Sequence, residues 1–108
     1  MIYHVKTLPE FEKELKRLAK KYPSLKDDML KLAKSLSQQP NQGTPLFKNC
    51  YKIRLAIKSK GKGKSGGGRV ITHFAIKKDS VYLLTIYDKS EKDSLPNQYI
   101  KLLLESFE

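Results

Sequence analysis

The feature that most constrains the fold is a loop of glycine and lysine flanked by runs with the pattern of β-strands. The loop, GKGKSGGGR, extends from Gly61 to Arg69. Before it, YKIRLAIK at residues 51–58 alternates apolar with mostly cationic residues, and after it VITHFAI and VYLLTIY have strand composition. Glycine and lysine do not build a hydrophobic core. The sequence therefore predicts a small sheet interrupted by a long, flexible, cationic loop, with the other segments supporting that sheet.

Helices are predicted on both sides of these strands. Apolar residues recur at steps of three and four in residues 8–22 and again in 25–36, with Pro23 between the two runs. Both starts have the pattern of a capping box, formed by Thr7 with Glu10 and by Ser24 with Asp27. A short strand is predicted at residues 2–5, and a last helix opens at residues 94–96.

The predicted order is β-α-α-β-β-β-α, which is an α+β fold. Residues 8–38 form a helical hairpin, and we expect it to pack on one face of a three- to four-stranded antiparallel sheet. The short C-terminal helix follows the sheet, whose other face is expected to be free and basic. With 108 residues and no internal repeat, the chain is expected to be one domain, residues 1–108.

The charge of the chain is concentrated in its middle. The formal net charge is +11, and residues 29–78 carry twelve Lys and Arg but no Asp or Glu. A cationic surface of this size is typical of proteins that bind nucleic acid, and it also fits a surface neutralised by an acidic partner protein. Membrane binding is disfavoured because the cations lie on strands and a loop and not on an amphipathic helix.

Several other classes of protein are disfavoured by particular residues. Lys58 stands where the segment KSKGKGKS would need the first glycine of a P-loop, and a strand follows where a helix is required. His4, His73 and Cys50 lack the close spacing of a zinc site, so no metal or other cofactor is expected. Cys50 has no second cysteine to pair with, which fits a reducing compartment, and no apolar leader or membrane span is visible. A cytoplasmic location is expected.

Candidate site residues follow from the alternation of the strands. Lys52 and Arg54 point to the face opposite Ile53, and Arg69 begins the next strand. Arginine is suited to bidentate contact with phosphate, so we favour nucleic-acid contact over a solvated basic face. Basic residues also follow the last strand, at Lys89 and Lys92. His73 shares a strand face with Arg69, although a structural role for it is favoured.

Three stretches carry a resemblance to a known family: YKIRLAI, the loop with GGGRVITHF, and VYLLTIYDKSEKDSL. Together with the paired helices, they resemble the RelE/HigB toxins of bacterial type II toxin–antitoxin modules. The resemblance implies a ribosome-dependent, metal-independent messenger-RNA endonuclease, in which a 2′-hydroxyl attacks the adjacent phosphate. It also implies partners, namely the ribosome with its mRNA and a cognate antitoxin with an acidic helix or tail. The free toxin is expected to be monomeric.

The resemblance assigns roles to the basic residues and leaves the aromatic residue of the site open. Residues expected to be catalytic are Lys52, Arg54, Arg69 and Lys89. Residues expected to contact RNA are Lys58, Lys60, Lys62, Lys64, His73, Lys92 and Tyr99. The chain has Pro96 near the place where some relatives carry a tyrosine, so either Tyr87 or Tyr99 is a candidate for that role.

Two alternatives remain at this stage. ParE-like toxins share this fold and inhibit DNA gyrase without being enzymes, and a non-catalytic nucleic-acid-binding module would also be basic. Lys52, Arg54 and Arg69 on one face argue against the gyrase inhibitor, because binding gyrase needs no cluster that faces a phosphate.

Overall fold

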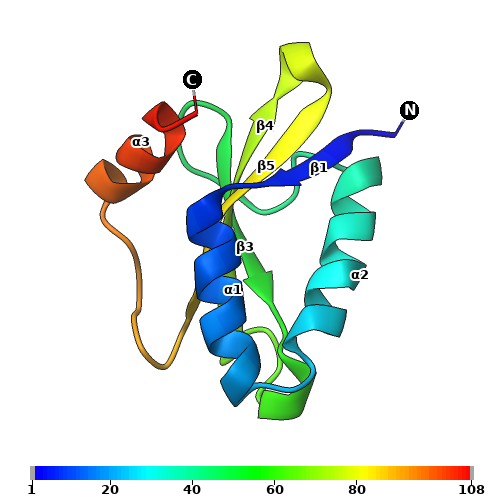
Figure 1. Cartoon of the computed structure of the whole chain (residues 1–108), viewed down its shortest axis with the longest axis vertical. Coiled ribbons are helices and arrows are strands. Elements are labelled where there is room, and N and C mark those ends of the chain that lie inside the picture. The colour runs from blue at the N-terminus through cyan, green and yellow to red at the C-terminus, as the bar shows by residue number, and fades with distance from the viewer. Residues whose placement is uncertain (1, 108) are drawn as a thin grey trace.

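The computed structural model describes residues 2–107, which form a mixed sheet between two helices on one face and one on the other (Figure 1). The helices are α1 (Pro9–Lys21), α2 (Leu25–Gln38) and α3 (Asn97–Glu105). The strands are β1 (His4–Thr7), β2 (Thr44–Pro45), β3 (Cys50–Leu55), β4 (Gly68–Ala75) and β5 (Ser80–Asp88). Short 3-10 turns, Lys58–Lys60 and Ile76–Lys78, follow β3 and β4. The predicted α+β class is confirmed.

The sheet has the order β1-β5-β4-β3-β2, and its pairing differs from the prediction at one edge. β3, β4 and β5 pair antiparallel, as expected, and β2 adds a further antiparallel strand in a segment for which a loop was expected. β1 pairs parallel with β5, from His4 opposite Ser80 to Thr7 opposite Leu83, so the expectation of a purely antiparallel sheet is wrong. The first strand pairs with the last one in the sequence, and parallel pairing requires such a long crossover connection.

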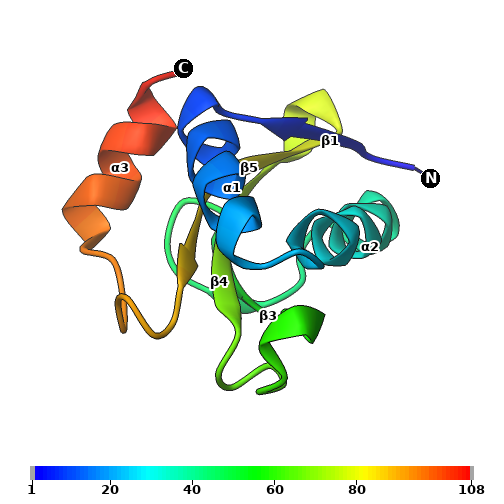
Figure 2. The same cartoon turned by 60° about the horizontal axis from the view of Figure 1, so that its bottom comes forward.

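The helical hairpin packs on one face of the sheet, as the periodicity predicts. Figure 2 shows α1 and α2 side by side on this face. Leu18, Leu25 and Leu36 are at most 1% exposed and belong to one core with Ile53 and Val70. Burying a leucine side chain stabilises a fold by about 1.5–3 kcal/mol, so this core is the main support of the sheet.

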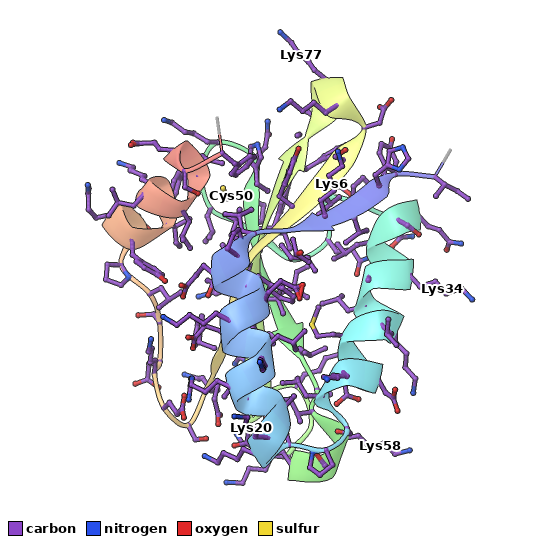
Figure 3. All side chains as sticks on the ribbon, in the orientation of Figure 1. Lys6, Lys20, Lys34, Cys50, Lys58 and Lys77 are labelled. Atoms are coloured by element: carbon purple, nitrogen blue, oxygen red, sulfur yellow. The ribbon has the colours of Figure 1, made fainter. Side chains whose placement is uncertain are left out.

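The opposite face of the sheet is not free, which corrects the second part of the expectation. α3 places Ile100 and Leu104 in a separate apolar cluster with Ile71, Leu84 and Cys50. Cys50 is labelled in Figure 3, between the sheet and α3. The apolar cluster occupies the part of this face that α3 covers, and the basic residues lie beyond it, toward the glycine–lysine loop.

Neither helix of the hairpin begins with the predicted capping box. Thr7 is the last residue of β1, and Leu8 occupies the N-cap of α1 without a side-chain cap hydrogen bond. Ser24 is at the N-cap of α2 but has helical backbone angles and also makes no cap bond. Its hydroxyl instead forms hydrogen bonds with Asp28 and Ser59. The side chain that the local pattern assigns to a helix cap is therefore used in other contacts.

Candidate functional site

The basic residues of β3, β4 and the segment after β5 surround a hollow of about 350 Å³ at the end of the sheet. The residues that line this cationic hollow are Thr44, Lys52, Arg54, Arg69, Lys89 and Asp93. The antiparallel register explains how they meet. Arg54 lies opposite Arg69, and Arg69 lies opposite Tyr87, so these three form one row across β3, β4 and β5. Directly paired side chains of a sheet have Cβ atoms about 4.5–5.5 Å apart.

The guanidinium of Arg69 is more deeply placed than the sequence predicts. Arg69 is 6% exposed, and its Nη1 donates to the carbonyl oxygens of Lys64 and Gly68, both at 3.0 Å. Its Nη2 donates to the carbonyl of Ser65 at 3.3 Å. Three of the five N–H groups of an arginine are therefore engaged with the loop. Arg69 therefore folds the loop back onto β4, and its two other N–H groups make no hydrogen bond within residues 2–107.

The other cations of the hollow are more accessible. Arg54 is exposed, and Lys52 is half-buried. The Nζ of Lys89 lies 2.9 Å from Asp93 Oδ1, and this hydrogen bond lowers the pKa of the Asp93 carboxyl. Asp93 has a side chain that is 93% exposed, and ion pairs between exposed side chains contribute little to stability. A phosphate group can therefore replace Asp93 as the partner of Lys89 at little cost.

The base of the loop is fixed by a buried carboxylate. Asp88 is fully buried, and Lys60 Nζ donates to its Oδ1 at 2.6 Å. The Tyr22 hydroxyl donates to the other carboxylate oxygen, while Ser90 donates through its N–H and hydroxyl, at 2.9 and 2.7 Å. Burial acts to raise the pKa of this carboxyl, but the bonds from Lys60, Tyr22 and Ser90 outweigh it and hold the pKa of Asp88 well below its ordinary value.

The 3-10 turn after β3 is tied to the helical hairpin as well. Asp28, at the first turn of α2, accepts the backbone N–H of Lys58 at 3.0 Å, and Ser24 accepts that of Ser59 at 2.8 Å. At the other end of the loop, a Cβ on Gly67 would lie 2.1 Å from the Leu55 carbonyl oxygen, so only glycine fits there. The loop is consequently anchored at both ends and is not the freely flexible segment that its composition indicates.

The expected RNA-contacting lysines divide into two groups. Lys58, Lys62, Lys64 and Lys92 are exposed to solvent. Figure 3 shows Lys58 at the end of the molecule where the hairpin turns. Lys60 does not belong with them, because its side chain is 7% exposed and its ammonium is paired with Asp88 inside the protein. Lys60 therefore anchors the loop inside the protein.

His73 and Tyr99 lie away from the cationic hollow. His73 is under α3, with its Nδ1 3.8 Å from Cys50 Sγ and its ring 6.1 Å from that of Phe107. The hydroxyl of Tyr99 donates to Glu10 on α1 at 2.7 Å. Burial, together with this bond, raises the pKa of Tyr99 to about 12. Tyr99 thus joins α3 to α1 and is not placed to meet a substrate in the hollow.

Tyr87 is the aromatic residue that the structure brings to the site. It is 2% exposed, neighbours Arg69 in the sheet, and lines a second hollow of about 190 Å³ that shares Lys52 with the cationic hollow. The sequence left open whether Tyr87 or Tyr99 serves the site, and only Tyr99 was expected to contact RNA. The alternation of apolar and polar residues along a strand normally indicates which face each side chain is on. In β5 a bulge near Thr85 interrupts this alternation, so the sequence did not show which face of the sheet carries Tyr87.

A third hollow, of about 490 Å³, lies between α2, β3 and the loop. Arg54 lines both this hollow and the cationic one, and Lys31, Lys58 and Lys64 are also part of its wall. The three hollows are therefore linked through Lys52 and Arg54 around the β3 side of the sheet.

None of the helices within residues 2–107 has the length and hydrophobicity that a membrane span requires. In the same part of the chain, no three His, Cys, Asp or Glu residues are grouped as metal ligands would be.

The fold is that of the RelE toxins. It matches a double mutant of the E. coli toxin RelE in the free state with a TM-score of 0.63 and 17% identity, over 86% of this chain and 90% of that chain. A RelBE-type toxin–antitoxin complex from Mycobacterium tuberculosis matches with a TM-score of 0.61 and 17% identity, over 82% and 92%. The isolated E. coli RelE toxin matches with a TM-score of 0.52 and 18% identity, over 95% of this chain and 97% of that chain. No protein-family model matches the sequence.

Proposed function

We propose that this protein is the toxin of a type II toxin–antitoxin module and acts as a ribosome-dependent messenger-RNA endonuclease. The observation that carries the proposal is the cationic hollow, in which Lys52, Arg54, Arg69 and Lys89 converge from β3, β4 and the segment after β5. The fold shared with RelE toxins over most of the chain supports the same conclusion. A cluster of this kind suits a reaction in which negative charge builds on a phosphate group.

The proposed reaction is transesterification of the RNA backbone. The 2′-oxygen of one nucleotide forms a bond to the adjacent phosphorus, and the bond from phosphorus to the 5′-oxygen of the next nucleotide breaks. One proton leaves the 2′-hydroxyl, and one is delivered to the departing 5′-oxygen. The products are a 2′,3′-cyclic phosphate and a 5′-hydroxyl, so that no metal ion is needed to balance the step.

The residues of the hollow suit different parts of this reaction. The planar guanidinium of an arginine matches the oxygens of a phosphate, and Arg69 keeps two N–H donors, so its role is to bind the non-bridging oxygens of the phosphate. Arg54, which is exposed beside it, can hold the RNA backbone. Lys52 and Lys89 are the groups that exchange protons with the 2′- and 5′-oxygens. The ribosome would present the RNA strand in the required geometry.

An acidic antitoxin is the proposed inhibitory partner. Residues 29–78 carry twelve cations without an acid, and an acidic segment laid across the cationic hollow would neutralise them. One of the matched structures is a toxin–antitoxin complex, which supports a partner of this kind. The cytoplasm is the compartment in which both the antitoxin and ribosome-bound mRNA would be met.

The test of the function is cleavage of mRNA by the purified protein, with and without ribosomes. We expect cuts only in ribosome-bound message, and Arg69→Ala should reduce the rate by roughly a hundred- to a thousandfold, the usual loss for a donor to a developing anion. Lys77→Ala is the matched control, because Lys77 is an exposed lysine in the turn before β5. Inhibition of gyrase without RNA cleavage would replace the proposal with the ParE-like alternative, and RNA binding without either activity would indicate a binding module.

A further inference from the structure

The hydroxyl of Tyr87 is a buried polar group that the proposed reaction does not use. The side chain is 2% exposed, and its oxygen has no hydrogen-bond partner among the residues that the structure describes. A buried donor without a partner destabilises a fold, and such groups are rare in proteins. Burial also raises the pKa of Tyr87, which leaves the hydroxyl neutral and available as a donor as well as an acceptor.

The hollow beside Tyr87 has walls of two kinds. Ile71, from β4, and Ile100, from α3, provide apolar sides, while Tyr87 and Asn97 provide groups that both donate and accept hydrogen bonds. At about 190 Å³ the hollow is smaller than the sites of drug-sized ligands, which are about 300–1,000 Å³. It is therefore suited to one small, flat group with apolar faces and a polar edge.

The position of this hollow relates it to the proposed substrate. Lys52 lines both the Tyr87 hollow and the cationic hollow, so the two are neighbours. A phosphate in the cationic hollow brings the rest of its own nucleotide within reach of the second hollow. A second phosphate fits that hollow poorly, because an anion buried against isoleucine would lose its hydration in exchange for a single lysine.

We propose that the Tyr87 hollow is a nucleobase subsite, in which the hydroxyl of Tyr87 and the side-chain amide of Asn97 bind the edge of a base. The base belongs to a nucleotide attached to the phosphate in the cationic hollow, and its faces pack against Ile71 and Ile100. RNA-binding proteins commonly recognise unstacked bases by such edge contacts. This inference rests on the proposed function for its substrate class, and it assigns to Tyr87 a part in selecting the cleaved sequence.

The experiment is a titration of the full-length protein with the 3′- and 5′-monophosphates of the four ribonucleosides, followed by NMR, with inorganic phosphate as the reference probe. We expect at least one nucleotide to bind more tightly than inorganic phosphate, and its affinity to depend on the base. One hydrogen bond corresponds to roughly a two- to tenfold difference in affinity. Tyr87→Phe removes that hydrogen bond, so the affinities for the four bases should then differ by no more than about twofold.

The matched control is Tyr82→Phe, since Tyr82 lies on the same strand and packs against Phe107, with ring centroids 4.4 Å apart, outside the Tyr87 hollow. This variant should keep the wild-type order of affinities. Equal affinity for all bases in the wild type would overturn the inference, as would an unchanged order in Tyr87→Phe. The titration contains no ribosomes, so it tests the subsite separately from cleavage. Base selectivity in a protein that does not cleave mRNA would reject the proposed nuclease activity but support the subsite. Cleavage of mRNA without base selectivity would support the nuclease activity but reject the subsite.

Discussion

Replacement of Asp88 by asparagine tests whether the loop is held by a buried ion pair. The carboxylate is fully buried and accepts hydrogen bonds from Lys60, Tyr22 and Ser90. Asparagine has nearly the same shape but carries no charge, and its amide nitrogen turns a donor toward groups that are themselves donors. The ammonium of Lys60, whose side chain is 7% exposed, then remains in the protein without its counter-charge.

The expected cost follows from this geometry. Removing one partner of a buried ion pair destabilises a protein by about 3–5 kcal/mol, because the other charge is left uncompensated. A domain of this size has a total stability of about 5–15 kcal/mol, so Asp88→Asn should remove a large fraction of it. At about 4 °C for each kcal/mol, the Tm should fall by roughly 12–20 °C.

The assay is thermal and urea unfolding of the wild type and three variants. Glu91→Gln is the matched control, because it makes the same acid-to-amide change in the pair with Arg17, whose side chains are 31% and 47% exposed. Its cost should stay below about 1 kcal/mol. Adding Lys60→Met to Asp88→Asn should recover stability, since it removes the stranded charge. A cost for Asp88→Asn no larger than that of Glu91→Gln would refute the buried anchor.

The same ion pair predicts how stability depends on pH. The pKa of Asp88 is lowered on folding, so its contribution is complete above the ordinary aspartate pKa of about 3.9 and is lost as the pH falls toward the folded value. The wild type should therefore lose stability steeply below about pH 4. Asp88→Asn should show a shallower loss in that range, and an identical acid profile in the two proteins would contradict the reasoning.

Three further predictions concern the site. Arg69→Lys keeps the charge but loses the planar fork that binds the loop carbonyls and a phosphate, so cleavage of ribosome-bound mRNA should remain impaired; activity within a few fold of wild type would count against this role. Tyr87→Phe should leave the free energy of unfolding unchanged or raise it by up to about 1–3 kcal/mol, because it removes an unpaired buried hydroxyl; a clear loss in urea unfolding would mean that the hydroxyl has a partner. Association with the cognate antitoxin should slow sharply as salt rises, and stopped-flow rates that are equal at low and high ionic strength would exclude electrostatic steering.

Local patterns in the sequence were sufficient for the three helices, the longer strands and part of the site. The steps of three and four in residues 8–22 and 25–36 predicted both helices of the hairpin, because one face of a helix must be apolar to pack on a sheet. The alternation in β3 placed Lys52 and Arg54 on the face opposite Ile53. The sequence alone also located the positive charge in residues 29–78.

The tertiary structure decided which of these residues act together. Nothing local shows that β1 pairs with β5, that α3 covers the second face of the sheet, or that Lys60 meets Asp88 inside the protein. These contacts join residues far apart in the chain, and the burial of the whole core selects among many combinations with similar local patterns. The charge of a lysine is written in the sequence, whereas its role depends on whether the fold places it in solvent, as with Lys62, or beside a buried carboxylate, as with Lys60.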